Sequence, residues 1–291
     1  MRALASIAAA LLLFGMASGG PAAAADSAPN ALKLEGPIEQ GSVVRGTAAP
    51  GASVKLDDQS LMVDPEGRFV FGFDRDASGT HDLKITWPSG KVEDETLSVA
   101  KRDWPIQSIT GLPPKEVTPP PTAYAQIKRE MAEKAAARKR DTKGSWFADK
   151  FIWPAKGPIS GVFGSQRIEN GVPKTPHYGV DIAAPEGSPV VAPAGGIVRL
   201  AGPAFYFEGG LVFIDHGHGL ISYTMHMSKV EVKVGQQVKQ GDEIGRVGHT
   251  GRATGPHVHW GMFWMDAHVD PQLLVPPMPP ATAAPGQTTN Q

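Results

Sequence analysis

The sequence contains no cysteine. Disulfide bonds, thiolate metal ligands and a cysteine nucleophile are therefore excluded. A bound metal ion would have to be held by histidine and carboxylate side chains. The charge is nearly balanced, with a formal net charge of −1 and an isoelectric point near 6.8. This balance predicts no nucleic-acid partner and no electrostatic attachment to a membrane.

Long apolar runs are missing beyond the beginning of the chain. The one run, residues 3–16, follows Met1-Arg2 and precedes the alanines at 22–25. This is the layout of a cleaved secretory signal, and the run is short for a membrane span. We therefore expect residues 1–25 to be a signal peptide. The mature protein is then expected in the periplasm or outside the cell, without a membrane span.

Convincing helical periodicity is scarce, whereas glycine (34) and proline (27) are plentiful and favour short strands and turns. Short β-prone runs alternate with turn signals up to about residue 99. We expect residues 26–103 to form a small β-sandwich. The order of Gly46–Leu56 and Asp64–Phe71 resembles bacterial immunoglobulin-like domains. A spacer or a docking module for a protein partner is the expected role of this region.

Residues 104–148 read as a linker in two parts. Pro113-Pro114 and Pro119-Pro120-Pro121 favour an extended polyproline form. Residues 124–143 are rich in alanine, lysine, arginine and glutamate, which predicts a basic helix. We interpret this helix as a solvated part of the linker, although it could also contact anionic wall polymers.

Strand patterns return from about residue 150. We expect residues 149–275 to form an antiparallel β domain. The segments 187–198 and 235–247 resemble each other as strand, glycine turn and strand, which suits a folded-over β structure. The end of the chain, residues 276–291, is rich in proline and threonine and is expected to be disordered.

His257-Val258-His259 has the spacing of a metal-binding pair, because alternate residues of a strand share a face. Two histidines alone decide little. Upstream, His177 and Asp181 are four residues apart and would share a face of an extended segment. With one downstream histidine they offer two nitrogens and one oxygen, and leave a coordination position for water, as in catalytic zinc sites.

Catalysis at such a site also needs a side chain that accepts and donates protons. The helical His-Glu-x-x-His motif, whose glutamate acts as the base, is absent. Histidine is the natural substitute. His226 lies in another strand-like segment. It could flank a water molecule together with whichever of His257 and His259 is not a ligand.

The motifs resemble, in their order, the zinc metallopeptidases of the lysostaphin and LytM type, family M23, which cut peptide bonds in bacterial peptidoglycan. The resemblance runs from about Trp153 to Leu274 and includes the segments HYGVDIAAPEGSPV, AGGIV, IDHGHGL, YTMHMS, VGQQVKQGDEIG and TGRATGPHVHW. It implies a lysostaphin-type antiparallel β domain with one Zn²⁺ per chain. The implied ligands are His177, Asp181 and His259, and the implied catalytic residues are His226 and His257.

All five implied positions are filled, so the resemblance implies an active endopeptidase that hydrolyses peptide cross-links between peptidoglycan stems. His218 and His249 stand where the family commonly has other residues, and we expect neither to be a ligand. His216 is interpreted as structural. With no lipid anchor or Gram-positive wall-binding repeat recognised, we expect the substrate to be a D-alanyl cross-link to diaminopimelate in a Gram-negative periplasm.

Two other classes of function remain open. Two histidines and one carboxylate also describe the facial triad of non-haem iron oxygenases. A non-enzymatic wall-binding protein, or an activator of other wall hydrolases, would keep the site but block it, for example with the helix at 124–143. A lipoyl or biotin carrier would need a lysine at a hairpin tip, and none lies between the two similar segments.

Overall fold

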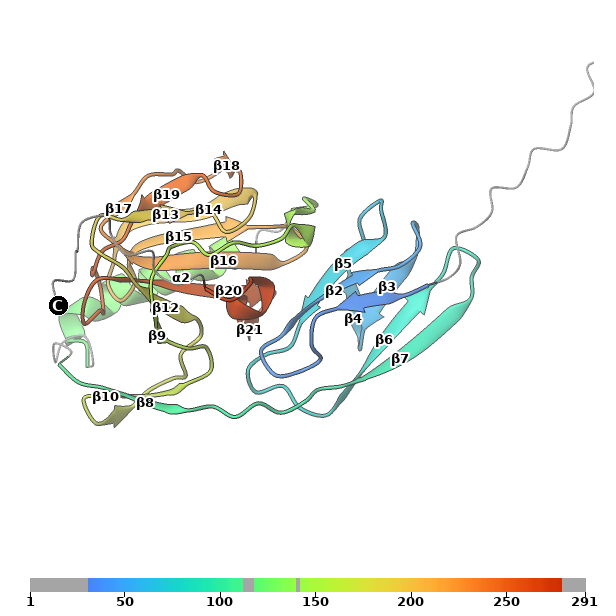
Figure 1. The fold of residues 1–291 in the computed structure, drawn as a ribbon, viewed down its shortest axis with the longest axis horizontal. Coiled ribbons are helices and arrows are strands. Elements are labelled where there is room, and N and C mark those ends of the chain that lie inside the picture. Colours follow the sequence, from blue (N-terminus) through green and yellow to red (C-terminus); the bar gives the residue numbers. More distant parts are fainter. Residues whose placement is uncertain (1–30, 112–117, 140–141, 279–291) are drawn as a thin grey trace, which may run out of the picture.

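The computed structural model describes residues 31–111, 118–139 and 142–278. The predicted signal peptide, most of the predicted tail and residues 112–117 of the predicted linker lie outside the described residues. Two β-rich lobes are visible in Figure 1, with strand β8 and helix α2 following the N-terminal lobe in the chain. Among the described residues, no helix combines the length and apolar character needed to cross a membrane.

The N-terminal lobe consists of two small antiparallel sheets, with strand orders β1-β2-β5 and β4-β3-β6-β7. In β6, Leu83 and Ile85 are buried while Asp82 and Lys84 are exposed, so one face of this sheet lies against the core. This is the expected β-sandwich. The strands are β1 (Lys33–Glu35), β2 (Val43–Thr47), β3 (Ser53–Leu56), β4 (Gln59–Leu61), β5 (Arg68–Gly72), β6 (Thr80–Thr86) and β7 (Val92–Ser98).

The C-terminal lobe is built on a large antiparallel sheet of order β18-β14-β15-β16-β20-β12-β9, with β21 paired to β20, and a smaller sheet of order β13-β19-β17. The antiparallel β class predicted for this region is confirmed. Its strands are β9 (Ile159–Gly161), β12 (Val180–Ala183), β13 (Pro189–Val191), β14 (Gly196–Phe205), β15 (Gly209–Asp215), β16 (Leu220–Met227), β17 (Lys229–Val230), β18 (Gln237–Val238), β19 (Glu243–Arg246), β20 (His257–Trp264) and β21 (Ala267–Val269).

The central strands of the large sheet are covered on both faces. Every residue of β15 is buried. One face, which includes Val212 and Val258, packs with the small sheet into one apolar cluster. The opposite face includes Phe213 and Phe263 and forms another cluster with Ala137 of helix α2 (Tyr124–Arg138). The helix predicted over 124–143 is therefore present up to Arg138, and it covers the sheet rather than standing in solvent.

The two lobes share one hydrophobic core. Buried side chains of the sandwich, such as Phe71, lie in the same apolar cluster as Trp260 and Trp264 of β20. Polar contacts add to this: the Arg45 Nε–H donates to the Phe147 carbonyl oxygen at 2.8 Å. The N-terminal lobe is thus packed directly against the C-terminal lobe and is not separated from it by a gap.

Part of the predicted linker is a strand. Residues Ile106–Ile109 form β8, which pairs in parallel with β10 (Gln166–Glu169), and β10 pairs in turn with β11 (Val172–Pro173). The segment predicted to be a proline-rich linker thus includes four residues of paired strand. The pairing fixes β10 beside the segment that carries His177. The short 3₁₀ turns are η1 (Pro121–Ala123), η2 (Trp146–Ala148) and η3 (Pro271–Leu274).

Candidate metal centre

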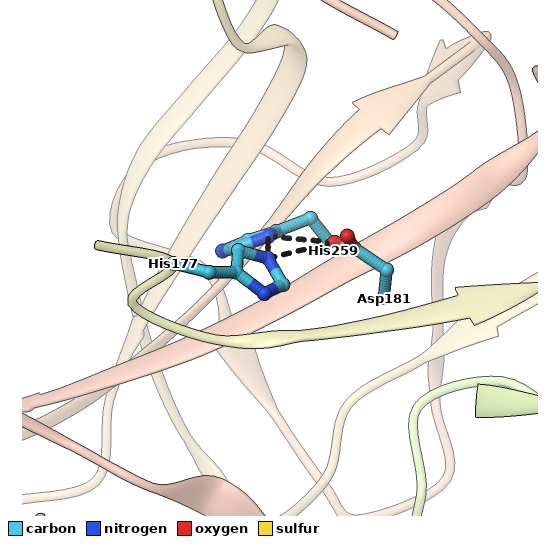
Figure 2. Close-up of side chains that lie close together, drawn as sticks. All are labelled: His177, Asp181 and His259. Atoms are coloured by element: carbon cyan, nitrogen blue, oxygen red, sulfur yellow. Dashed lines mark hydrogen bonds and ion pairs between the residues drawn. The ribbon is translucent and has the colours of Figure 1, made fainter. Parts of the chain in front are cut away.

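Three predicted side chains meet at the junction of β12 and β20. The antiparallel register places Asp181 opposite His259, and His177 lies just before β12. His177 Nε2 is 3.0 Å from Asp181 Oδ1 and 2.8 Å from His259 Nδ1, and His259 Nδ1 is 2.9 Å from Asp181 Oδ1 (Figure 2). Two strands that are far apart in the sequence therefore bring two imidazole nitrogens and one carboxylate oxygen to a single point.

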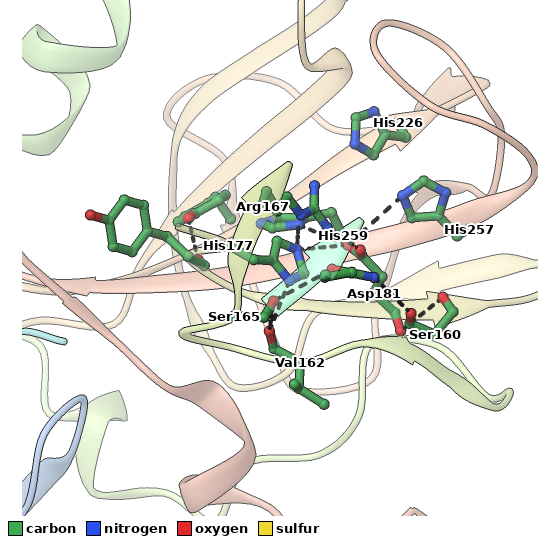
Figure 3. Close-up of polar contacts among 12 residues, drawn as sticks. Ser160, Val162, Ser165, Arg167, His177, Asp181, His226, His257 and His259 are labelled. Carbon is green, nitrogen blue, oxygen red and sulfur yellow. Dashed lines mark hydrogen bonds and ion pairs between the residues drawn. The ribbon is translucent and has the colours of Figure 1, made fainter. Parts of the chain in front are cut away.

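Hydrogen bonds orient these ligand atoms. The His177 Nδ1–H donates to the Val162 carbonyl oxygen at 3.0 Å, which leaves the Nε2 lone pair for the cluster. The other carboxylate oxygen of Asp181 is paired with the Arg167 guanidinium, which leaves Oδ1 for the cluster (Figure 3). Lone pairs that face one another at these distances repel unless a proton or a cation lies between them. The donor set fits Zn²⁺, which binds imidazole and carboxylate.

Two glycines leave room for the ligands. A Cβ atom at Gly161 of β9 would lie 2.4 Å from Asp181 Oδ2, and one at Gly179 would lie 2.5 Å from His259 Nε2. Both separations are far below van der Waals contact. The glycines therefore permit the close approach of backbone and ligand side chains.

The protonation states suit a metal. Burial raises the pKa of Asp181, but the charges and hydrogen bonds of His177 and His259 outweigh it and hold this pKa well below the usual 3.8. Burial also lowers the pKa of His259 from 6.5 to about 3. Near pH 7 the carboxylate is ionised and His259 is neutral, which are the forms that bind a cation.

His226 and His257 stand beside this cluster, with their ring centroids 4.7 Å apart (Figure 3). The His226 Nδ1–H donates to the Thr250 carbonyl oxygen at 2.9 Å, and the His257 Nδ1–H donates to that of Gly255 at 2.8 Å. In a neutral ring this tautomer leaves Nε2 as the acceptor nitrogen, and Nε2 of His257 is 3.8 Å from Asp181 Oδ1. Burial, with His257 and His259 nearby, lowers the pKa of His226 well below 6.5. His226 is therefore neutral near pH 7 and can accept a proton.

The backbone at His226 departs from the strand. Its φ is 67°, in the left-handed region, and its N–H donates to the Glu208 carbonyl oxygen at 2.8 Å. Strict alternation along β16 would place His226 with Thr224, on the face that packs toward the small sheet. The left-handed turn re-aims the side chain toward the cluster, at a cost in backbone strain that is common at functional sites.

Arg167 is a site residue that the sequence did not reveal. It reaches Asp181 because β10 is held against β8, a pairing between segments about 60 residues apart that no local pattern signals. Arg252 is similarly engaged. Its guanidinium pairs with buried Glu169 at 3.1 Å, so the loop before β20 is bridged to strand β10 beside the site.

Three further histidines that the sequence analysis considered lie outside the cluster. His216 is buried between the Gly195 carbonyl oxygen at 2.6 Å and Ser222 Oγ at 2.7 Å, and burial lowers its pKa to about 4. The ring of His218 packs against Phe147. His249 is exposed and pairs with Glu186 at 3.0 Å. Each has a contact that does not involve the cluster.

The cluster opens into a cavity of about 340 Å³. His177, His226 and His259 line it on one side, and residues of α2 line it on another. The arrangement can bind a divalent cation, admit a ligand next to it and move protons through the imidazoles of His226 and His257.

Comparisons with known proteins agree with this geometry. Residues 175–271 match the family model of peptidase family M23. A crystal structure assigned to peptidase M23, from Pseudomonas aeruginosa, has a TM-score of 0.64 and 33% identity, covering 82% of this chain and 95% of that chain. Cell division protein DipM of Caulobacter vibrioides is 34% identical over 170 residues, which are 55% of this chain and 26% of that protein.

Peptidoglycan DD-endopeptidase ShyA of Vibrio cholerae is 39% identical over 110 residues, which are 38% of this chain and 25% of that protein. The chain thus spans about a quarter of the length of these two curated relatives. By contrast, it spans nearly all of the Pseudomonas aeruginosa chain. The matched family model, together with this coverage at 33% identity, shows that the chain belongs to peptidase family M23.

Proposed function

We propose that the chain is a zinc-dependent endopeptidase that hydrolyses peptide cross-links of bacterial peptidoglycan, using one Zn²⁺ per chain. The observation that carries the proposal is the meeting of His177, Asp181 and His259, whose ligand atoms all lie within 4.8 Å of one another. The imidazoles of His226 and His257 stand beside them. This is the inventory that metal-assisted hydrolysis of an amide requires.

In the proposed site, His177 Nε2, His259 Nδ1 and Asp181 Oδ1 would hold the metal. When bound, Zn²⁺ supplies Lewis-acid polarisation of the scissile carbonyl and lowers the pKa of a water molecule to about 7. Arg167 keeps the Asp181 carboxylate turned so that one oxygen faces the ligand position. The Val162 carbonyl oxygen does the same for the His177 ring.

His226 and His257 handle protons in this proposal. One of them accepts the proton of the attacking water at Nε2. The other, in its protonated form, stabilises the developing oxyanion and assists departure of the amine. Their Nδ1–H bonds to main-chain carbonyls keep both rings oriented for this task.

The names of the relatives favour a particular bond. ShyA and ShyC of Vibrio cholerae are named peptidoglycan DD-endopeptidases, and Mpg of Neisseria meningitidis a DD-carboxypeptidase/endopeptidase. For this chain we propose the D-alanyl cross-link to diaminopimelate. We also propose export to the periplasm, on the signal-like residues 1–25 and the location of that polymer.

A second candidate is a wall-binding protein or activator without hydrolytic activity. The observation that favours it is the position of α2, whose residues Met131, Lys134 and Arg138 line the cavity. A site that is complete but permanently covered would hydrolyse no substrate, while other surfaces of the chain could still bind the wall polymer.

Metal analysis and digestion of a defined substrate test the proposal. The purified chain should contain one zinc per molecule and should release monomers with new amino groups from D-alanyl cross-linked muropeptide dimers, followed by mass spectrometry. Iron in place of zinc after aerobic purification would favour oxygenase chemistry instead. A zinc-loaded chain that binds the dimers without ever cleaving them would support the second candidate.

A further inference from the structure

The turn after β9, residues 162–165, holds the candidate ligand His177 by its ring and by its backbone. The His177 Nδ1–H donates to the Val162 carbonyl oxygen at 3.0 Å (Figure 3). The His177 backbone N–H donates to the Ser165 carbonyl oxygen at 2.8 Å, and the Gly164 N–H donates to the His177 carbonyl oxygen at 2.7 Å. The position of His177 Nε2 therefore depends on the position of this turn.

The same turn is bound to the N-terminal lobe. Arg75 is a buried residue of the loop between β5 and β6, and its Nε–H donates to the Gly164 carbonyl oxygen at 2.7 Å. Phe163 is buried beside Trp104, with ring centroids 5.8 Å apart. It also packs close to Gly41, where a Cβ atom would lie 2.6 Å from Phe163 Cε1. The turn is thus hydrogen-bonded to the N-terminal lobe through its backbone and packed against it through its phenylalanine.

Arg75 is held on two further sides. Its guanidinium carbon lies 5.1 Å from the Trp104 ring centroid, and its Nη1 pairs with Asp76 at 2.5 Å. Gly164 is tightly enclosed as well, since its φ is 82° and a Cβ atom would lie 2.1 Å from Trp104 Cε3. A planar guanidinium that is already ordered loses little conformational freedom when it donates to one more acceptor. The Arg75–Gly164 hydrogen bond is therefore a stiff link between the lobe and the turn.

The residue before Arg75 reaches the other side of the candidate ligand. Asp74 Oδ2 accepts a hydrogen bond from the His268 backbone N–H at 2.9 Å. The His268 ring stacks on Tyr178, with centroids 3.8 Å apart and an interplanar angle of 22°. Tyr178 directly follows His177 in the chain. Two adjacent residues of the N-terminal lobe thus support both the turn that binds His177 and the residue next to it.

We propose that Asp74 and Arg75 are positioning residues of the metal centre, which fix turn 162–165 and Tyr178 and thereby place His177 Nε2 opposite Asp181 and His259. This inference rests on the proposed zinc site, whose candidate ligands all belong to the C-terminal lobe. Loss of a group that orients a metal ligand typically weakens metal binding by about 10- to 100-fold. The N-terminal lobe then contributes to metal affinity although it supplies no ligand atom to this group.

Arg45 provides a matched control. It is also an arginine of the N-terminal lobe, and its Nε–H and Nη2–H donate to the carbonyl oxygens of Phe147 and Asp149, each at 2.8 Å. Its guanidinium carbon lies 5.5 Å from an aromatic ring, that of Phe151. Loss of either arginine removes a contact between the lobes. Of the two, Arg75 is the one whose acceptor residue also bonds to His177.

The first test compares Arg75→Ala with Arg45→Ala in the full chain. The Kd for zinc is measured by competition with a colorimetric chelator, and the melting temperature of the metal-free protein is measured beside it. Both variants should melt below the wild type, because both lose a contact between the lobes. We expect the Kd for zinc to rise by about tenfold or more in Arg75→Ala and to match the wild type in Arg45→Ala.

Cobalt reports the geometry of the site as well as its affinity. The visible absorption of Co²⁺-loaded protein depends on how its ligands are arranged around the ion. At saturating Co²⁺, the spectrum of Arg45→Ala should superimpose on that of the wild type, whereas that of Arg75→Ala should differ in position or intensity. A role of Arg75 in stability alone would leave all three spectra the same.

A measurement without metal separates this inference from the proposed function. In metal-free full-length protein, proton–nitrogen NMR follows the exchange of the His177 imidazole Nδ1–H with water. Faster exchange in Arg75→Ala than in Arg45→Ala and the wild type would support the inference even if the chain binds no zinc. If Arg75→Ala does not fold, Arg75→Lys and Arg45→Lys carry the same comparison. Equal exchange and equal zinc affinity within such a pair would overturn the inference and leave the endopeptidase function intact.

Discussion

Main-chain carbonyls decide which nitrogen of each important imidazole carries the proton. His177, His226 and His257 each donate Nδ1–H to a carbonyl oxygen, so in the neutral form of each ring Nε2 is the acceptor. His259 has the opposite arrangement, since its Nδ1 faces the cluster. The backbone therefore fixes the tautomer of each ring, and the nitrogen available for chemistry follows from strand and loop geometry. The carbonyl groups belong to Val162, Thr250 and Gly255.

His226→Ala should separate proton transfer from metal binding. His226 belongs to the pair beside the cluster and contributes no atom to the three-ligand group. We expect full zinc content by atomic emission and a fall in kcat of about 10²- to 10⁴-fold on muropeptide dimers. A variant that cleaves as fast as the wild type would remove His226 from the proposed mechanism.

His177→Ala and Asp181→Asn should instead lose the metal together with the activity. Each removes a donor atom, and Asp181→Asn also leaves the Arg167 guanidinium without its anionic partner. Zinc retained against a chelator should fall well below one per chain, with an unchanged circular-dichroism spectrum. Wild-type zinc retention in either variant would contradict the ligand assignment.

His216 gives a pH prediction that does not involve the metal. Its pKa is lowered by burial from 6.5 to about 4, so the unfolded chain binds more protons between these values and stability falls as pH falls through this window. The loss approaches about 3 kcal/mol by pH 4 and is absent above pH 6.5. Urea unfolding of wild type and His216→Gln should show a stability difference that shrinks below pH 6.5. A difference that is constant from pH 4 to 7 would refute this account.

The spacing of the site residues was predictable, but part of their surroundings was not. Strand alternation places His257 and His259 on one face, and the same argument pairs His177 with Asp181. The family resemblance then assigned the roles of these residues and of His226. Arg167 could not be found in this way, because its contact with Asp181 depends on a parallel pairing across about 60 residues. The left-handed backbone at His226 is likewise a tertiary feature, since histidine carries no local signal for it.

At the scale of elements, strands with clear alternation and turn signals were predictable, whereas short edge strands were not. β6 buries Leu83 and Ile85 in a regular pattern. In β8, by contrast, Ile106 is 70% exposed, so its sequence looks like a linker. The composition of α2 predicted a helix, but charged residues do not reveal which face will dock. The helix ends at Arg138, with Lys139 as its C-cap residue.

The packing of β9 against β12 depends on a glycine opposite the candidate ligand Asp181. Gly161 pairs with Asp181 in the register, and a Cβ there would lie 2.4 Å from Oδ2. Gly161→Ala should displace the carboxylate and weaken zinc binding by about 10- to 100-fold, the range typical of disturbed ligand support. Competition with a colorimetric chelator measures this effect. Unchanged affinity would show that the strands can separate without disturbing the site.

At the scale of the whole molecule, the two lobes form one packed unit. Their apolar residues belong to one cluster, and the Arg102 guanidinium of the inter-lobe segment pairs at 2.9 Å with buried Asp270 near the end of the described chain. The Arg75 Nε–H donates to the Gly164 carbonyl oxygen at 2.7 Å, and the Gly164 N–H donates to that of His177. The N-terminal lobe therefore supports the loop that carries a candidate ligand.

Calorimetry should reveal this coupling. Since the lobes share a core, we expect one unfolding transition for the full chain. Removing zinc should lower its midpoint, because a ligand that binds only the folded state stabilises it, by about 4 kcal/mol at a free concentration 1,000 times Kd. Two transitions, with one of them insensitive to a chelator, would show that the lobes unfold independently.

The central claim is that His177, Asp181 and His259 hold one catalytic zinc ion. Anomalous diffraction at the zinc absorption edge, from crystals of the zinc-loaded full chain, measures this directly. The account predicts a single strong peak within bonding distance of His177 Nε2, Asp181 Oδ1 and His259 Nδ1. A peak at another group of side chains, or none in protein that cleaves peptidoglycan, would contradict it.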